Sequence, residues 1–477
     1  MVEQRPPSKR QERYLARVRG SPREPWPVMD ALHTLVIQEE LAEGEQLSLE
    51  WRELWDNARE DAQRYGMPES MIQRIDDAVA AVREVDPAIE RIRVGDSDKV
   101  VLLLGAGASA PEPSGIPTVN SLLPELWRRA KRIGRDDIDR LAEWCEERRV
   151  TNIEDLLTAA HVANFAAKNT SVTGLLDYFL FRGPRTTGEE RLPYGRPRSE
   201  EVPQVDAASI ALLQDTLQTL FGLLMGTMIP ARPNRAHDAV IRFLREHPSA
   251  CIVTTNYDGC IDEALLRGQL GFSTLIGGGA IASDICLIKI HGSINWSYCD
   301  SCQEVREFEL LDLKAAYEND SLSYPVIGIC KTCGGQRRPL LVPPMGFKFV
   351  MFPNLIRLWD SARQRIEDAD YLVVVGYSFS EADTYLSKII MRSMTAKARQ
   401  RIVVCDPDGS LVPNLRSRFT AHIDGFDSKR VLHAVGPCEE LLPQVLESLV
   451  SPAQPAAAEE GEKASRKRRT PHRAATE

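Results

Sequence analysis

The 477-residue sequence lacks any long apolar run. Spanning a bilayer takes about 18 to 20 consecutive apolar residues. The longest runs here, such as Val100–Leu104 and Tyr371–Val375, are only as long as a strand. No apolar stretch follows the first residues, MVEQRPPSKR, so the sequence predicts no secretory signal. We therefore expect a cytoplasmic protein that makes no use of a membrane.

The chain also lacks the cysteine density of a disulfide-stapled protein, with ten cysteines in 477 residues. Four of them are closely paired, as Cys299-x-x-Cys302 and, 27 residues later, Cys330-x-x-Cys333. Each C-x-x-C turn presents two thiolates, and two such turns complete a tetrahedral Cys₄ site. Four thiolates fill all the coordination positions of a tetrahedral zinc ion and leave none for a substrate or water. The spacing therefore predicts a structural zinc ion within 299–333, not a catalytic one. Reduced, unpaired thiols are the alternative.

A basic excess is absent as well, because the formal net charge is −9. This argues against nucleic acid as a partner of the whole molecule. Basic residues do gather at both ends, within residues 1–23 and at 466–469. The pattern favours solvated termini, with a nucleic-acid-binding arm as the alternative.

The chain divides into four segments by pattern. Residues 1–25 are basic and proline-rich, which predicts an arm or linker. Residues 26–95 carry apolar residues at spacings of three and four, which predicts helices that cover the main domain or bind a protein partner or a second copy. The main domain is predicted at 96–450. Residues 451–477 lack apolar periodicity and are predicted to be disordered.

Short continuous apolar runs, separated by helical patterns, recur through the main domain. A run without alternation suits a strand that is buried on both faces, as in a parallel sheet. Strands that alternate with helices predict an α/β fold with a doubly wound parallel sheet. The five clearest runs are 100–104, 251–254, 287–290, 371–375 and 401–405.

A glycine-rich segment follows the first run directly. Gly105, Ala106, Gly107 and Ser109 belong to a sequence that fits G-x-G-x-x-G/A. The glycines allow a tight turn, and the N-terminus of a following helix offers N–H groups to a pyrophosphate. A plain strand–helix turn is the alternative.

Polar residues follow the next two runs, at the strand ends where parallel sheets bind ligands. Asn256 and Asp258 come after the second run, where Asp258 could instead cap the next helix through an Asx turn. His291 precedes Gly292 and could serve as an acid or base near neutral pH. A structural histidine whose hydrogen bonds are satisfied is the alternative.

The last two runs end in further candidate ligand-binding residues. The segment that contains Gly376 and Ser378 superficially resembles a nucleophile elbow, but Ser380 replaces the closing glycine and His291 comes earlier in the chain, which excludes a hydrolase triad order. A turn that offers N–H and hydroxyl groups to a phosphate or ribose fits better. Asp406 could accept hydrogen bonds from ribose hydroxyls.

Taken in order, these motifs resemble the sirtuin family of silent-information-regulator-like, NAD-consuming enzymes over about residues 96–440. The resemblance lies in Gly105-Ala106-Gly107-Ala108-Ser109 with Ser114-Gly115-Ile116-Pro117 (GAGxS…SGIP), in Thr254-Thr255-Asn256-Tyr257-Asp258 (TQNxD), in His291-Gly292, in the cysteine pairs that follow, in Gly376-Tyr377-Ser378 (GTS), and in Asp406-Pro407 in place of Asn-Pro.

The resemblance implies a Rossmann-like large domain, a smaller zinc-bearing lobe with a helical insert, and NAD as the substrate in the cleft between them. It implies a role for each site residue: Ala106, Gly107 and Ser109 at the pyrophosphate, Asn256 and Asp258 at the nicotinamide and ribose, His291 as general base, and Ser378 and Asp406 at the adenosine half.

Departures from the family pattern bear on the reaction. Thr118-Val119-Asn120 stands where deacylases have Asp-Phe-Arg, and Pro343-Pro344 removes two N–H donors from the strand edge that a peptide substrate would need. Helical segments at 26–95 and about 120–233 are unlike a minimal deacylase.

These departures make the chain resemble bacterial sirtuin-like NAD hydrolases of antiviral defence more closely. We therefore expect an NAD glycohydrolase that releases nicotinamide and ADP-ribose. An NAD-dependent protein deacylase or ADP-ribosyltransferase is one alternative. A nucleotide-binding sensor that regulates a partner through residues 1–95 is the other.

Overall fold

The computed structural model describes most of the chain, and the structural statements below concern those residues. They are residues 9–19, 25–37, 47, 49–80, 84–95, 97–132, 134, 137–168, 207–276, 285–318, 328–343, 348–379 and 383–450. The tail at 451–477, predicted to be disordered, lies outside them.

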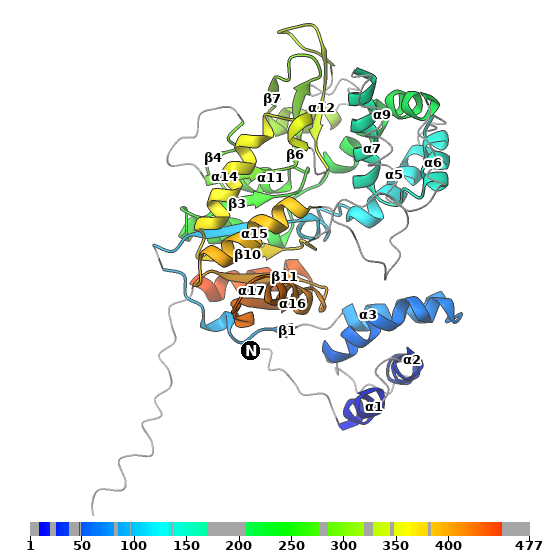
Figure 1. Cartoon of the computed structure of the whole chain (residues 1–477), viewed down its shortest axis with the longest axis vertical. Helices are drawn as coiled ribbons and strands as arrows, with labels where there is room; N and C mark the ends of the chain where they lie inside the picture. The colour runs from blue at the N-terminus through cyan, green and yellow to red at the C-terminus, as the bar shows by residue number, and fades with distance from the viewer. Residues whose placement is uncertain are drawn as a thin grey trace, which may run out of the picture.

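An eight-stranded sheet forms the centre of the main domain (Figure 1). Its order is β1-β12-β11-β10-β2-β3-β5-β4, and every neighbouring pair is parallel except β1 with β12. The strands are β1 (Glu84–Val85), β2 (Val100–Leu104), β3 (Cys251–Thr254), β4 (Phe272–Ser273), β5 (Ile285–Lys289), β10 (Tyr371–Val375), β11 (Arg401–Asp406) and β12 (Val431–Val435). The predicted α/β fold with a doubly wound parallel sheet is confirmed, with one antiparallel strand added at its edge.

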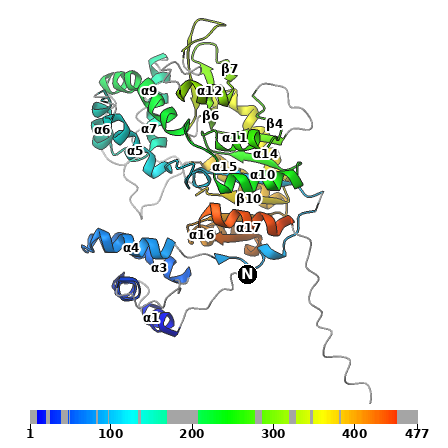
Figure 2. The same cartoon turned by 180° about the vertical axis from the view of Figure 1, so that it is seen from behind.

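The strands are continuously apolar because helices cover both faces of the sheet. Along β2, Val101 and Leu103 pack into one core, whereas Leu102 and Leu104 pack into the other. Full burial of each such side chain stabilises the fold by about 1.5–3 kcal/mol. Figures 1 and 2 show the two helical layers from opposite sides. One layer holds α14 (Leu355–Asp368), α15 (Thr384–Ala396) and α16 (Leu411–His422), and the other holds α10 (Arg235–Glu246), α11 (Cys260–Arg267) and α17 (Cys438–Val450).

Strand β2 lies at the point where the strand order reverses. The chain runs from β2 to β3 on one side, and later returns with β10 on the other side. In the register of these three strands Leu104 lies opposite both Thr254 and Val375. The segments after β2, β3 and β10 therefore emerge side by side at one edge of the sheet, where doubly wound folds bind ligands.

A smaller antiparallel sheet and a helical bundle lie beside this edge. The sheet has the order β7-β6-β9-β8, with β6 (Gly292–Cys299), β7 (Val305–Glu307), β8 (Gly328–Ile329) and β9 (Gln336–Leu341). The helices are α5 (Val119–Arg132), α6 (Asp137–Arg148), α7 (Ile153–Lys168), α9 (Ala207–Met228), α12 (Leu310–Glu318) and α13 (Lys348–Met351). Ile294 and Leu341 of the small sheet pack into the core of α5, α6, α7 and α9, which joins the helical insert to this lobe.

Four helices near the N-terminus have a core of their own. They are α1 (Lys9–Arg19), α2 (Pro25–Leu32), α3 (Leu49–Arg64) and α4 (Glu69–Ala80), with a short π-helical turn η1 (His33–Ile37) after α2. Trp51 and Trp55 are fully buried among them. Helix α1 lies within residues 1–25, which we expected to be an arm. The structure differs there because Leu15 and Val18 give this basic segment an apolar face that packs into the same core.

Among the described residues, the structure contains no helix with the length and apolar character that crossing a bilayer requires.

Candidate active site and metal centre

The glycine-rich segment after β2 packs directly against the segment after β10. The Gly107 N–H donates to the Gly376 carbonyl at 2.8 Å, and the Gly105 N–H donates to the Val375 carbonyl at 2.9 Å. A Cβ at Gly105 would lie 2.5 Å from the Gly376 oxygen, and Gly376 itself has a φ of +59°. Only glycine fits this contact, because the two backbones touch.

The glycine-rich segment does not continue into the helix that the motif predicts. It forms one 3₁₀ turn, η3 (Ala106–Ala108), and the next α-helix begins only at Val119. The N–H groups of Gly105, Gly107, Ala108 and Ser109 already donate to backbone carbonyls, so a pyrophosphate at this turn would meet neither a helix N-terminus nor a row of free N–H groups. Ala106 and Gly107 are partly exposed there, whereas Ser109 is buried.

Asn256 ties the segment after β3 to the glycine-rich turn. Its Nδ2 donates to the Gly105 carbonyl at 3.0 Å and to Ser109 Oγ at 3.2 Å. Both amide hydrogens are thus used within the protein, so the side chain presents Oδ1 as an acceptor. Because Asn256 is only half-buried, a bound water or ligand hydroxyl can reach that acceptor.

His237 joins this group, and sequence reasoning missed it. The Asn234 N–H donates to His237 Nδ1 at 3.2 Å in a capping box at the start of α10. Nδ1 also lies 2.9 Å from Asn234 Oδ1, and Nε2 lies 3.4 Å from Ser109 Oγ. Ser109 Oγ accepts from Asn256 and has a hydrogen of its own to donate. An Asn three residues before His, ahead of an apolar run, was the available signal.

The Asp258 side chain forms the Asx turn before the next helix, which the sequence analysis gave as the alternative to ligand binding. Its Oδ1 accepts from the Cys260 N–H at 2.9 Å and so begins α11. The buried Lys289 Nζ donates to the Asp258 carbonyl at 2.7 Å and to Asp262 Oδ2 at 2.8 Å. These contacts fix the segment after β3 firmly against β5.

His291 lies just beyond β5, almost fully buried, beside two charged residues that sequence reasoning missed. Its Nε2 is 3.4 Å from Asp383 Oδ2, an ion-pair distance outside the geometry of a formed hydrogen bond. Lys348 Nζ lies 3.4 Å from Asp383 Oδ1, and the Tyr377 hydroxyl donates to Oδ2 at 3.3 Å. Burial lowers the pKa of His291 below 6.5, although Asp383 acts to raise it. The ring is therefore neutral at pH 7 and able to accept a proton.

Ser378 and Asp406 follow the neighbouring strands β10 and β11. Ser378 is exposed, whereas Asp406 is buried and its Oδ1 accepts from the Asp408 N–H at 2.9 Å. Val375 pairs with Cys405 in the sheet, so both residues lie at the same edge as the glycine-rich turn. We call the residues at this edge, namely Gly105–Ser109, Asn256, Asp258, His291, Gly376, Ser378 and Asp406, the switch-point site.

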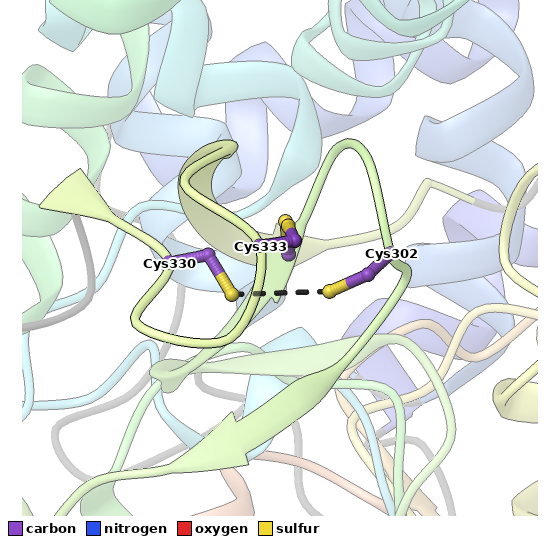
Figure 3. Close-up of side chains that lie close together, drawn as sticks. Cys302, Cys330 and Cys333 are labelled. Carbon is purple, nitrogen blue, oxygen red and sulfur yellow. Dashed lines mark hydrogen bonds between the residues drawn. The ribbon is translucent and has the colours of Figure 1, made fainter.

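The four paired cysteines form a single cluster at the tip of the small sheet. Their sulfur atoms all lie within 4.8 Å of one another, with Cys299 Sγ 3.4 Å from Cys333 Sγ and Cys302 Sγ 3.8 Å from Cys330 Sγ. Figure 3 shows Cys302 and Cys330 pointing toward one another, with Cys333 beside them. Four sulfurs at about 2.3 Å from one zinc ion are about 3.8 Å apart, so the cluster fits zinc.

In the cluster without metal, the thiols differ in acidity. The Glu304 N–H acts to lower the pKa of Cys302, but burial and the neighbouring thiols raise it to about 12. Cys330 is the thiol whose surroundings favour the thiolate. Burial acts to raise the pKa of Cys330, but the backbone N–H groups of Thr332 and Cys333 outweigh it and lower the pKa to about 6. The buried Arg337 guanidinium donates to Cys330 Sγ at 3.5 Å and also to Ser297 Oγ at 3.0 Å. One positive charge thus lies beside the anionic group that four thiolates and Zn²⁺ would make.

A second group of possible ligands, His237, Asp258 and Cys260, also lies within 4.8 Å. It fits a metal poorly, because burial raises the pKa of Cys260 and disfavours the thiolate that a metal needs. His237 Nδ1 and one Asp258 oxygen already take part in the helix-capping contacts described above.

The fold and this site define an α/β protein with a glycine-lined ligand edge and a Cys₄ cluster. No protein-family model matches the chain. The chain is 25% identical over 231 residues to an NAD-dependent protein deacetylase of Sulfolobus acidocaldarius, which covers 48% of this chain and 73% of the relative. It is 25% identical over 195 residues to NAD-dependent protein deacylase 1 of Archaeoglobus fulgidus, covering 41% and 64%.

A third relative, NAD-dependent protein deacetylase 2 of Caldanaerobacter subterraneus subsp. tengcongensis, is 27% identical over 158 residues, covering 32% of this chain and 50% of the relative. The chain therefore spans less than two thirds of two of these relatives. Together the three support the resemblance to sirtuins. A solved Sir2 homologue–NAD complex is 18% identical with a TM-score of 0.41, covering 77% of this chain and 94% of that one.

Proposed function

We propose that this chain is a sirtuin-type, NAD-consuming enzyme, and that it hydrolyses NAD to nicotinamide and ADP-ribose. The observation that carries the proposal is the arrangement at the switch-point site. There the Asn256 amide is held between Gly105 and Ser109, in the segment that also holds Tyr257, whose ring centre lies 6.4 Å from that of His291. The three relatives, all named as NAD-dependent enzymes, support the substrate.

Each part of NAD would meet a different part of the site. The pyrophosphate would lie on Gly105, Ala106 and Gly107, where the Ser109 hydroxyl donates to a phosphate oxygen. Asn256 and Asp258 would border the nicotinamide ribose. Gly376, Ser378 and Asp406, at the ends of β10 and β11, would contact the adenosine half, with Asp406 accepting from ribose hydroxyls.

The chemistry would rest on Asn256 and His291. Loss of nicotinamide leaves positive charge on the ribose carbon, and a water held by Asn256 Oδ1 is placed to attack it. The neutral His291 ring takes up the proton that the attack releases, directly or through a ribose hydroxyl. In balance, the bond from the ribose carbon to nicotinamide breaks with its electron pair going to nicotinamide, and the water's oxygen supplies the pair for the new bond to that carbon.

Hydrolysis is favoured over deacylation by the edge of the small lobe. Pro343 lies two residues beyond the end of β9 and has no N–H to offer an added peptide strand, while Pro344 lies outside the described residues. Depletion of NAD would suit an antiviral role. The four N-terminal helices, which have their own core, would carry any contact with a protein partner or a second copy.

The test is to incubate the purified protein with NAD alone and to measure nicotinamide and ADP-ribose by chromatography. A parallel reaction contains an acetyl-lysine peptide. Release of both products without peptide supports hydrolysis. Peptide-dependent O-acetyl-ADP-ribose would instead establish the deacylase, and binding of NAD without turnover would establish the sensor.

A further inference from the structure

Three titratable residues meet in the interior at the switch-point site, and two of them are charged, a rare arrangement in a protein core. Asp383, before α15, is 2% exposed, and so is Lys348 at the start of α13. His291 is 4% exposed. A charge is buried at high cost unless it is paired, so such a group implies a use that outweighs the cost.

Asp383 is the centre of the group. One of its carboxylate oxygens faces Lys348 Nζ, and the other faces both His291 Nε2 and the Tyr377 hydroxyl. Burial raises the pKa of Asp383, but His291 and Lys348 outweigh burial and bring the pKa to about 2. The carboxylate is therefore ionised at any pH at which the protein would work.

Lys348 is held from its other side by aromatic rings. Its Nζ lies 3.7 Å from the centre of the Trp359 ring and 6.0 Å from that of Tyr385. A cation over an aromatic face is stabilised by the ring quadrupole. Lys348 can thus stay charged next to Asp383 although burial lowers its pKa.

The surroundings of His291 include further groups on several elements. Tyr257, after β3, lies with its ring centre 6.4 Å from that of His291, and Trp359 of α14 lies at 5.8 Å. The full charges that act on His291 are Asp383, which favours the protonated ring, and Lys348, which opposes it.

We propose that Asp383 and Lys348 are positioning residues for His291: Asp383 orients the ring and favours its protonated form, and Lys348 keeps Asp383 ionised and fixed. This inference rests on the proposed function, because it assigns Asp383 as the partner of His291, the proposed general base. A histidine that must gain a proton during a reaction benefits from a carboxylate beside it. The opposing lysine keeps the resting ring neutral.

The decisive measurement is the protonation of the His291 ring itself. Histidine-labelled protein is titrated by NMR, and the His291 signal is identified by its loss in His291→Gln. Asp383→Asn should lower the pKa of His291, whereas Lys348→Met should raise it. A purely structural role would not move the pKa in opposite directions, so equal or absent shifts would overturn the proposal.

Two further variants keep the test decisive. If Asp383→Asn folds poorly because Lys348 is left unpaired, the double variant removes both charges, and its His291 pKa should lie between those of the single variants. Asp76→Asn is the matched control, because Asp76 likewise pairs with a basic residue, Arg59, and accepts from a tryptophan, Trp55, but in the N-terminal core. It should leave the His291 signal unchanged.

Kinetics separate this inference from the proposed function. In an active enzyme, Asp383→Asn should lower kcat at least tenfold with a smaller change in KM, and Lys348→Met should shift the acidic limb of the pH profile to higher pH. If no variant and no wild-type protein cleaves NAD, the proposed function fails. The opposite pKa shifts would still establish the buried trio as a device that sets the charge of His291.

Discussion

The cysteine cluster and the switch-point site are built in opposite ways. All four thiols of the cluster come from residues 299–333, on two neighbouring turns of one small sheet. The switch-point site collects its residues from the ends of β2, β3, β5, β10 and β11. One site depends on local chain geometry, and the other depends on the order of strands in a sheet. The cluster should therefore fail through loss of one ligand, whereas the switch-point site can lose chemistry and keep its fold.

The largest effect is expected at the cluster. Cys330→Ser removes one of four thiolates, so the protein should lose its zinc and the small lobe should unfold at a lower temperature. Structural zinc sites in small peptides bind with about 10–16 kcal/mol at neutral pH, and much of that is folding free energy. Metal analysis of protein purified without chelator, together with thermal melting, measures both consequences.

Cys145→Ala is the matched control, because Cys145 is buried in the helical core and belongs to no cluster of potential metal ligands among the described residues. Its metal content should equal that of the wild type. Wild-type protein that contains no zinc under reducing conditions would contradict the assignment of the four cysteines to a structural zinc site.

The next effect concerns chemistry at the switch-point site. Asn256→Ala and His291→Ala should each lower NAD cleavage about a hundredfold or more, the usual size for an oriented polar group in a transition state. The sheet should persist, because neither residue is part of a strand. Nicotinamide release measures the rate, with thermal melting as a check on folding.

A more selective variant is Asn256→Asp, which keeps the shape but replaces the two donated hydrogens by an acceptor facing Gly105 and Ser109. It should weaken binding as well as turnover. Asn152→Ala is the control, because Asn152 accepts from the Asp155 N–H at the start of α7, away from the strand ends. Cleavage at the wild-type rate by the Asn256→Ala and His291→Ala proteins would show that the site is wrongly assigned.

The contrast between local chain geometry and strand order also explains which features could be predicted from the sequence. The strands could be predicted because burial on both faces gives continuous apolar runs, and the cluster because its ligands follow a fixed local spacing. Lys348, Asp383 and the contact of His237 with Ser109 could not be predicted. Their partners lie far away in the sequence and meet only through the strand order. Helix α1 was missed because its basic composition concealed Leu15 and Val18.

A smaller effect is expected on the free energy of unfolding at low pH, because buried histidines lie both at the switch-point site and beside the small sheet. Burial lowers the pKa of His161 to about 4, and it also lowers those of His237 and His291. Unfolded histidines take up protons near pH 6.5, whereas these folded ones do not, so the free energy of unfolding should decrease as the pH falls below about 6.5. His161 alone should account for about 2 kcal/mol at pH 5.

Urea denaturation at pH 7.5 and pH 5 measures this loss. His161 Nε2 donates to the Leu341 carbonyl at 2.8 Å, which links α7 to β9, so His161→Gln should make the unfolding free energy less dependent on pH. His422→Gln, at an exposed position, should leave the dependence unchanged. A stability that does not change between the two pH values would contradict the expected burial of neutral rings.

The smallest effect is expected at the far end of the switch-point site. Ser378 is exposed at the end of β10, on the side that we assign to the adenosine half of NAD and away from the bond that breaks. Ser378→Ala removes one neutral hydrogen bond, worth about 0.5–1.5 kcal/mol, which corresponds to roughly a 2- to 13-fold change in an equilibrium constant. We therefore expect KM for NAD to rise within that range while kcat stays nearly constant, since the hydroxyl contacts substrate and transition state alike.

The control is Ser410→Ala, because the Ser410 hydroxyl is likewise exposed and donates to Asp408 Oδ1 at 2.7 Å. A fall in kcat with unchanged KM would place Ser378 beside the reacting bond, and the assignment of the two halves of NAD would have to be exchanged.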